Sequence, residues 1–254
     1  NTCYYSWQRQ IMKTVYWGAF PAEESGISVS ELRYAEPVSI LKGLKPKEFF
    51  GPNAGMCPAI VDEGKNTFKI NSPIDIDVTF AEDFSDIDSK YPADDGYLQH
   101  YIGPFGPDKV IQLAQPTYLF FCEDPLLMTQ LPPYYEQSTF TEHCMGLSAT
   151  FDISSWFRVV KPAFKLKDGS RRIAMSTDDA IMYLKFNTDE KIKLVRFDAS
   201  PFAKEHKDVL EHMVAFKFHK KNPLVPTTLI AGYEAFKRAR YHKKIIKIIN
   251  ENLL

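Results

Sequence analysis

The sequence predicts a mainly β fold, in which an antiparallel sandwich or jelly-roll-like core is followed by two C-terminal α-helices. Three observations support this prediction. Aromatic residues, which favour strands, make up 14% of the 254 residues. The 17 prolines disfavour long helices, because proline lacks a backbone N–H and clashes with the preceding turn. After residue 200, the spacing of the apolar residues changes from the period of a strand to that of a helix.

The clearest strand is expected at residues 74–80. Ile74, Ile76, Val78 and Phe80 alternate there with polar residues. A period of two places the four apolar side chains on one face of the strand. We therefore expect that face to be buried in the core.

Further short strands are expected along the chain. Residues 67–70 are interpreted as the pairing partner of the 74–80 strand. Residues 117–122 and 126–131 are interpreted as two buried strands around a tight turn, or as one strand with a bulge. The other expected strands are 12–17, 38–41, 148–153, 156–160, 163–167, 171–175, 180–187 and 191–197. Many short strands at this spacing predict antiparallel pairing in a sandwich, a jelly roll or a barrel.

Two turn signals fall between these strands. Asp168-Gly169 predicts a β-hairpin, and residues 188–190 predict a short hairpin loop. Residues 1–200 are therefore expected to form one β-rich domain. Within it, residues 1–56 are expected to be irregular, because prolines and glycines interrupt them densely.

A C-terminal helical extension is expected at residues 201–254, packed on the β-rich domain or projecting from it. Ser200-Pro201 predicts the N-cap and the first position of a helix over residues 201–216. A second helix is expected from residue 227 or 228 to about residue 250. Its apolar stripe changes face near Arg240, so a straight helix cannot bury both halves against one flat surface.

The second half of that helix is the sharpest functional feature of the sequence. We expect a partner protein, or a second copy of the chain, to contact Tyr241, Ile245, Ile248 and Ile249. Packing of the helix on its own domain is the alternative. A basic patch on the same helix favours nucleic acid as a further alternative, because a row of cations can lie along phosphates. The patch consists of Lys237, Arg238, Arg240, Lys243, Lys244 and Lys247.

No catalytic constellation stands out, and we expect no catalytic residue, no metal ligand and no cofactor. The chain contains no GxSxG, HExxH, CxxC or P-loop motif. Cys144 follows His143, but neighbouring side chains of a strand point to opposite faces, so Cys144 is interpreted as a buried structural cysteine. A candidate ligand surface consists of Tyr134, Trp156 and Arg158, with core packing as the alternative.

Charge and cysteine content indicate the expected compartment. The chain has 31 basic and 32 acidic residues, and a net charge of -1 predicts no global attraction to nucleic acid or membranes. No apolar run approaches the length of a membrane span, and no secretory signal is visible. The four cysteines are widely spaced, which favours free thiols in a reducing compartment such as a cytosol.

Several short runs within residues 57–197 carry a resemblance to a known group. They are Cys57-Pro58-Ala59, Ile70-Asn71-Ser72-Pro73-Ile74-Asp75, Pro132-Pro133-Tyr134, Trp156-Phe157-Arg158, Met182-Tyr183-Leu184-Lys185-Phe186-Asn187-Thr188 and Lys191-Ile192-Lys193. In these runs the chain resembles uncharacterised proteins of marine tailed phages. The resemblance implies a viral origin and a location in the host cytoplasm or the virion. It implies no particular chemistry.

Together, these observations predict a non-enzymatic module that works by binding or as a structural component. It would be a virion component or a host-directed interaction protein. One alternative is a cupin-like β-barrel enzyme with a small-molecule or metal site in the mouth of the barrel. The other is binding of nucleic acid through the basic C-terminal helix.

Overall fold

The computed structural model describes residues 12–19, 34–43, 57–82, 87–89, 110–113, 118–155, 157–204 and 241–254. Several of the predictions lie outside these residues. They concern the first residues of the chain, Trp156, most of the helix over 201–216, the first half of the last helix, and Lys237, Arg238 and Arg240.

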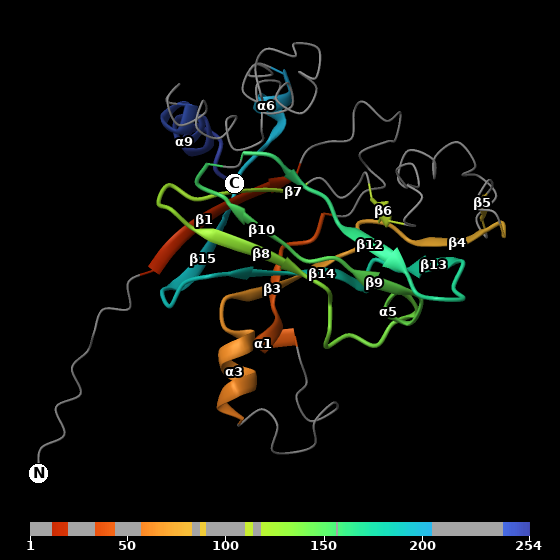
Figure 1. The fold of residues 1–254 in the computed structure, drawn as a ribbon. Coiled ribbons are helices and arrows are strands. Elements are labelled where there is room, and N and C mark those ends of the chain that lie inside the picture. Colours follow the sequence, from red (N-terminus) through yellow and green to blue (C-terminus); the bar gives the residue numbers. More distant parts are fainter. Residues whose placement is uncertain are drawn as a thin grey trace, which may run out of the picture.

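Two sheets form the body of the molecule (Figure 1). The four-stranded sheet has the order β11-β7-β1-β15, and its strands are β1 (Met12–Ala19), β7 (Tyr118–Phe121), β11 (Val159–Val160) and β15 (Lys191–Arg196). The five-stranded sheet has the order β10-β8-β14-β3-β2, and its strands are β2 (Val38–Ser39), β3 (Thr67–Asn71), β8 (Leu127–Leu131), β10 (Ala149–Asp152) and β14 (Ala180–Phe186). The fold is therefore mostly β and sandwich-like, as predicted.

Two smaller sheets continue the body at one end, on the right of Figure 1. One contains β6 (Val110–Gln112), β12 (Ala163–Leu166) and β9 (Cys144–Gly146), and the other contains β13 (Arg172–Met175), β4 (Ile76–Phe80) and β5 (Ile87–Ser89). Helix α5 (Thr139–His143) lies at the same end.

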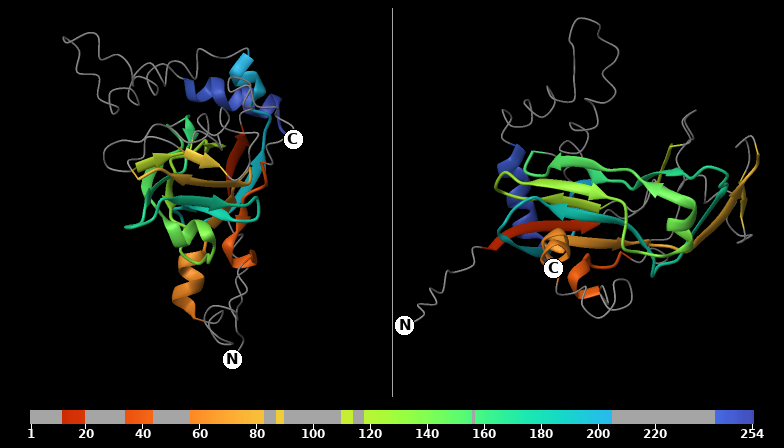
Figure 2. Two further views of the ribbon diagram at one scale, coloured as in Figure 1. Left: turned by 90° about the vertical axis from the view of Figure 1, so that its right-hand side faces the viewer. Right: turned by 60° about the horizontal axis from the view of Figure 1, so that its bottom comes forward.

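Helices cover the outer faces of the body. Figures 1 and 2 show α6 (Ser200–Lys204) and α9 (Tyr241–Glu251) beside the four-stranded sheet, and α1 (Ile40–Gly43) and α3 (Pro58–Gly64) on the opposite side. The main apolar core contains Val15 and Trp17 of β1, Phe120 of β7, and Leu184 and Phe186 of β14. Because successive side chains of a strand point to opposite faces, these residues define the inner faces of both sheets.

One pair of strands departs from the predicted antiparallel pattern. β1 and β15 are parallel, with Met12 opposite Lys191 and Trp17 opposite Arg196. Every other pair of named strands in the described residues is antiparallel. The two strands are far apart in the sequence, so no short turn requires them to run in opposite directions.

The strand expected at residues 74–80 is confirmed as β4, and Ile76, Val78 and Phe80 are buried on one face. The predicted pairing with residues 67–70 is wrong. Those residues form β3, which pairs with β14 and β2, whereas β4 pairs with β13 and β5. The chain leaves β3 through Ser72, whose backbone N–H donates to the carbonyl oxygen of Asp179, and so enters a different sheet.

Connections between consecutive strands cross from one sheet to the other. β7 and β8 are separate strands, as one of the two interpretations had it, but they belong to different sheets. β14 and β15 also lie in different sheets, so the hairpin predicted at residues 188–190 is wrong. Asn66, whose backbone is in the left-handed region with φ of 54°, stabilises the connection between β14 and β15. Its side-chain amide donates to the carbonyl oxygens of Thr188 and Glu190, both at 2.8 Å.

The Asp168-Gly169 turn is present, but it does not make a hairpin. Gly169 has φ of +77°, where glycine has no steric penalty, and the N–H of Ser170 donates to the carbonyl oxygen of Lys167 at 2.9 Å. β12, before the turn, pairs with β6 and β9, whereas β13, after it, pairs with β4. The turn therefore also joins two different sheets.

The C-terminal segment packs on the four-stranded sheet. α6 begins at Ser200, and the carboxylate of Asp198 accepts a hydrogen bond from the N–H of Ser200 at 2.9 Å. After α9, the chain pairs with the edge of β15, because the N–H of Leu254 donates to the carbonyl oxygen of Arg196 at 3.1 Å. Residues 252–254 thereby cover one end of an edge strand.

The structure corrects the assignment of the apolar face of α9 to a partner interface. Ile245, Ile248 and Ile249 are buried, and Tyr241 is partly buried, in a second core cluster of this chain. The cluster also contains Leu119, Phe121, Phe157, Phe197, Ala199 and Phe202. The outward side chains of β7 require a cover, and α9 supplies it, so the alternative of packing on the body holds for these residues.

The substitution Ile249→Ala should therefore lower the free energy of unfolding by about 2–5 kcal/mol, because it leaves a cavity at a fully buried site. Lys247→Ala on the same helix is the matched control, since that side chain is 76% exposed, and it should change stability by less than about 0.5 kcal/mol. Urea denaturation measures both. Equal effects of the two substitutions would mean that α9 does not hold the fold together.

Candidate protein-binding surface

The structure separates the residues of the predicted ligand surface. Trp156 lies outside the described residues. Tyr134 contacts Tyr183, whose side chain points away from the main core on the five-stranded sheet. Arg158 follows Phe157, which packs with α9 outside the four-stranded sheet. Tyr134 and Phe157, the neighbour of Arg158, therefore lie on opposite sides of the sandwich.

Tyr134 instead belongs to a tyrosine cluster, made of Tyr134, Tyr135 and Tyr183. The ring centroids of Tyr134 and Tyr135 are 4.5 Å apart with an interplanar angle of 66°. Those of Tyr134 and Tyr183 are 5.1 Å apart with an angle of 79°. Both contacts are edge-to-face, the arrangement in which the positive edge of one ring meets the negative face of another.

The pattern of β14 places Tyr183 on the outer face. Leu184 and Phe186 point into the main core, whereas Tyr183 and Lys185 alternate with them and point outward. The Pro132-Pro133 segment that follows β8 ends that strand and brings Tyr134 over Tyr183. The alternation of β14 thus places Tyr183 at the base of the cluster, and the Pro132-Pro133 segment places Tyr134 above it.

Two carboxylates and one lysine complete the cluster. The hydroxyl of Tyr134 donates to Oε1 of Glu63 at 3.2 Å, and Nζ of Lys185 pairs with Oε2 of the same carboxylate at 2.7 Å. The hydroxyl of Tyr183 donates to Glu136 at 3.0 Å. Burial, and then the neighbouring carboxylates, raise the pKa of Tyr134 and of Tyr183, so both remain neutral hydrogen-bond donors.

Exposure distinguishes the members of this cluster. Tyr183 is fully buried, whereas 41% of Tyr134 is accessible to solvent. An exposed tyrosine ring that is fixed by two other rings and a hydrogen bond loses little conformational entropy when a partner covers it. Such tyrosines are typical of the energetic centre of protein–protein interfaces. The geometry therefore suits contact with a protein surface.

The structure describes half of the predicted basic patch. Lys243 and Lys247 are exposed on α9, Lys244 is partly buried, and Lys247 lies 3.9 Å from Glu251. His242, on the same helix, is held against the body by its contact with the carbonyl oxygen of Glu123 at 2.8 Å. The helix is thus fixed with Lys243 and Lys247 in solvent.

Cys144 and His143 do not form a reactive pair. Cys144 is 4% exposed, and burial raises the pKa of its thiol to about 12, so the thiol remains protonated at neutral pH. His143 faces Ser170 instead, with 2.9 Å between Nδ1 and Oγ. Cys144 therefore has the structural role that the sequence indicated.

In the described part of the chain, no group of three or more His, Cys, Asp and Glu side chains is placed to hold a metal ion. Nor does any helix in that part have the length and apolar character needed to cross a membrane.

Comparison of the chain with protein-family models, with curated proteins and with solved structures finds no match. The tyrosine cluster is therefore interpreted from its own geometry. The sequence analysis singled out Tyr134, but it missed the roles of Tyr183 and Glu63. The alternation of Tyr183 and Lys185 with core residues of β14 was the signal that would have revealed the outer face.

Thiol reactivity provides a test of the burial of the cysteines. In a Cys3→Ser background, a disulfide reagent should modify Cys57 rapidly in the native protein, and Cys122 and Cys144 only after unfolding, because those two are buried. Measurement of released thiolate at pH 8 gives the number of fast sites. Cys57→Ser should abolish the fast phase, and fast modification of two or more thiols would contradict the described burial.

The same burial predicts how stability depends on pH. Because the pKa of Cys144 is raised from 9.0 to about 12, the folded state keeps the proton that the unfolded state loses. The contribution of Cys144 to stability is therefore complete below about pH 9 and is lost as the pH rises from 9 to 12. Cys144→Ala should make the decline of stability over that window shallower in urea denaturation.

Proposed function

We propose that the protein is a non-enzymatic binding module that contacts a protein partner through Tyr134 and the tyrosine cluster. The supporting observation is that Tyr134 is 41% exposed, and yet its side chain is fixed by Tyr135, Tyr183 and Glu63. Tyrosines contribute a large contact area and need few rotatable bonds to be ordered, which favours tight association.

The proposal includes a jelly-roll-like scaffold and a C-terminal extension of two helices. It is supported by the connections β7–β8 and β14–β15, which pass between the two facing sheets as consecutive strands of a jelly roll do. The parallel pair of β1 and β15 is a departure from that arrangement. A rigid scaffold of this kind suits a protein whose outer surfaces do the binding.

The proposed setting is a phage, with the protein acting as a virion component or as a host-directed interaction protein. Its location would then be the virion or the host cytoplasm. The support is the resemblance of the runs within residues 57–197 to proteins of marine tailed phages.

A second candidate function is binding of nucleic acid, and it is favoured by the orientation of α9. The contacts of Ile245, Ile248 and Ile249 with the body leave Lys243 and Lys247 in solvent. Cations on a fixed helix can neutralise phosphates and release their counterions.

Photo-crosslinking tests the protein-binding proposal. A photoreactive phenylalanine analogue at Tyr134 should give one defined protein adduct in a lysate of cells that make the chain, or in particles purified from them. The same analogue at Leu127, which is 48% exposed, is the matched control and should give no such adduct. An adduct in particles supports a virion component, and an adduct in lysate alone supports a host-directed factor. Equal yields at both positions, or no adduct at either, would refute the surface.

Salt dependence tests the second candidate. If α9 binds duplex DNA, replacement of Lys243 and Lys247 by alanine should reduce the slope of log affinity against log salt by about 2, since each phosphate contact contributes about 0.9. Fluorescence anisotropy with a random-sequence duplex measures the slope. Lys165→Ala, an exposed cation of β12, is the control and should leave it unchanged. Binding that does not depend on salt would remove this candidate.

A further inference from the structure

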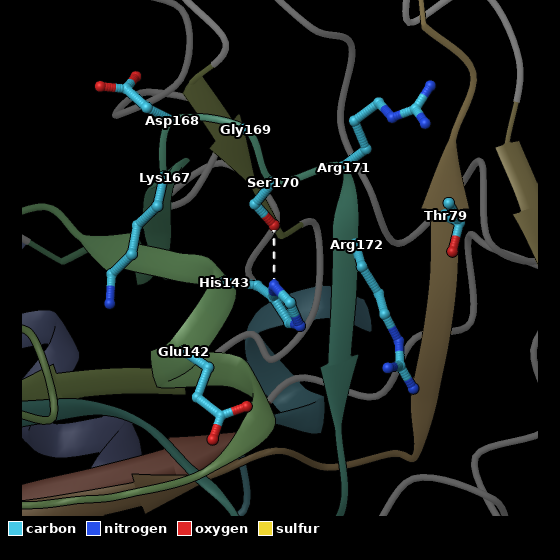
Figure 3. A pocket seen from close by; sticks show the side chains of 9 residues that line it. All are labelled: Thr79, Glu142, His143, Lys167, Asp168, Gly169, Ser170, Arg171 and Arg172. Carbon is cyan, nitrogen blue, oxygen red and sulfur yellow. Dashed lines mark hydrogen bonds between the residues drawn. The ribbon is translucent and has the colours of Figure 1, made fainter.

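A hollow of about 480 Å³ lies at the end of the body that carries the smaller sheets (Figure 3). It lies between the end of α5, the turn from β12 to β13, and β4. Most of its lining residues carry polar or charged side chains, and the lining consists of Thr79, Glu142, His143, Lys167, Asp168, Gly169, Ser170, Arg171 and Arg172. The tyrosine cluster shares none of these residues, so this hollow is a separate site.

A histidine and a serine face each other in the centre of the hollow. His143 is the last residue of α5, and Ser170 follows Gly169 in the tight turn before β13. Their side chains are joined by the contact of 2.9 Å between Nδ1 and Oγ (Figure 3). The contact fixes the imidazole ring, so its Nε2 side and the serine hydroxyl are held in place as polar groups at the surface of the hollow.

An arginine is held rigidly on the other side. The guanidinium of Arg172 donates from Nε and Nη2 to the two carboxylate oxygens of Asp77, both at 2.9 Å. This two-point contact fixes the plane of the guanidinium. Among the described contacts, Nη1 of Arg172 has no protein acceptor, and 45% of the side chain is exposed. The arginine is therefore positioned in advance and still has N–H donors to offer.

The charges of the lining are arranged unevenly. In Figure 3 the carboxylates of Asp168 and Glu142 and the amino group of Lys167 lie on one side of the hollow, and the guanidinium groups of Arg171 and Arg172 lie on the other. Arg171 is paired only loosely, at 3.6 Å, with a Glu82 side chain that is 92% exposed. Such an exposed pair is easily exchanged for another anion. The arginine side of the hollow thus presents two guanidinium groups, each paired with one carboxylate.

We propose that this hollow binds an oxyanion of the phosphate class, either the free ion or a phosphate monoester. Arg172 of β13 would contribute its remaining N–H groups, Ser170 of the preceding turn would contribute a hydroxyl, and His143 of α5 would contribute a ring N–H. Arg171 would add charge from the rim. Donors of several kinds suit a tetrahedral anion, and guanidinium groups are well matched to phosphate oxygens.

The same geometry does not assemble a hydrolase. In serine hydrolases, the histidine that contacts the serine is oriented by a carboxylate on its other nitrogen. In the described part of the chain, the structure gives His143 no hydrogen bond to a carboxylate, and Glu142 is directed away from Ser170 (Figure 3). The pair is therefore assigned to ligand binding.

Titration with inorganic phosphate tests the site. Amide spectra of the ¹⁵N-labelled full chain should shift in the β12–β13 turn and at the end of α5 when phosphate is added at constant ionic strength. Chloride and acetate at the same ionic strength should shift them less. Phenyl phosphate is the second probe. Tighter binding of the monoester would identify a phosphorylated ligand, and equal or weaker binding would identify the free ion.

Three substitutions assign the binding to the proposed residues. His143→Ala, Ser170→Ala and Arg172→Lys should each weaken phosphate binding about tenfold or more, because each removes a hydrogen bond to a charged group. Arg172→Lys keeps the positive charge, so its effect isolates the loss of the guanidinium fork. Lys165→Ala, on the neighbouring strand and outside the hollow, is the matched control and should leave the affinity unchanged.

The alternative outcomes are distinct. The site does not exist if the His143, Ser170 and Arg172 variants all bind phosphate with the affinity of the unsubstituted protein. It also does not exist if phosphate and chloride shift the spectra equally. If Arg172→Lys alone unfolds the chain, as its spectrum would reveal, the His143 and Ser170 variants still decide the question. None of these residues belongs to the tyrosine cluster. A negative phosphate titration therefore does not affect the protein-binding proposal, and a negative crosslinking result does not affect the phosphate-binding proposal.

Discussion

The contact between Phe120 of β7 and Phe186 of β14 joins the two main sheets, with ring centroids 6.2 Å apart. On one side it continues to Tyr118 and from there to Trp17, and on the other it continues to Phe68. Each such ring removes about 150–250 Å² from water. The row of rings runs through both sheets, so it fixes which face of every central strand is the inner one.

Once the inner faces are fixed, the chemistry of the outer faces follows from the period of the strands. Leu119 and Phe121 of β7 must point outward on one side, and Tyr183 and Lys185 of β14 must do so on the other. The first pair is apolar and is covered by α9, whereas the second is polar at its tips and is covered by Tyr134, Tyr135 and their carboxylate partners. The aromatic core therefore determines where a helix docks and where a binding surface is left.

The sequence predicted the strands well and their neighbours poorly. A period of two identified β4, because alternation reports which face of a strand is buried, and apolar runs between turn signals identified the series from β10 to β15. It carries no information on which strand lies alongside, and a tight turn such as Asp168-Gly169 directs the chain into a new sheet as readily as into a hairpin. The parallel contact of β1 with β15 joins distant segments and has no local signal. The hollow was missed for the same reason, since His143 and Arg172 come to line one hollow only through the pairing of distant strands.

The error over α9 has a physical cause that was present in the sequence. An apolar helix face indicates burial, but it does not distinguish a partner from the chain's own body. The deciding segment is β7, where Tyr118, Leu119, Phe120 and Phe121 are all buried. A strand that is apolar on both faces needs a layer on each side. The same argument applies to β14, whose five successive buried residues also need a second layer. There the second layer includes the loop that carries Tyr134 and Tyr135. This loop is only one side chain thick, so its outermost residue stays partly exposed. Tyr134 is therefore both part of the fold and available to a partner.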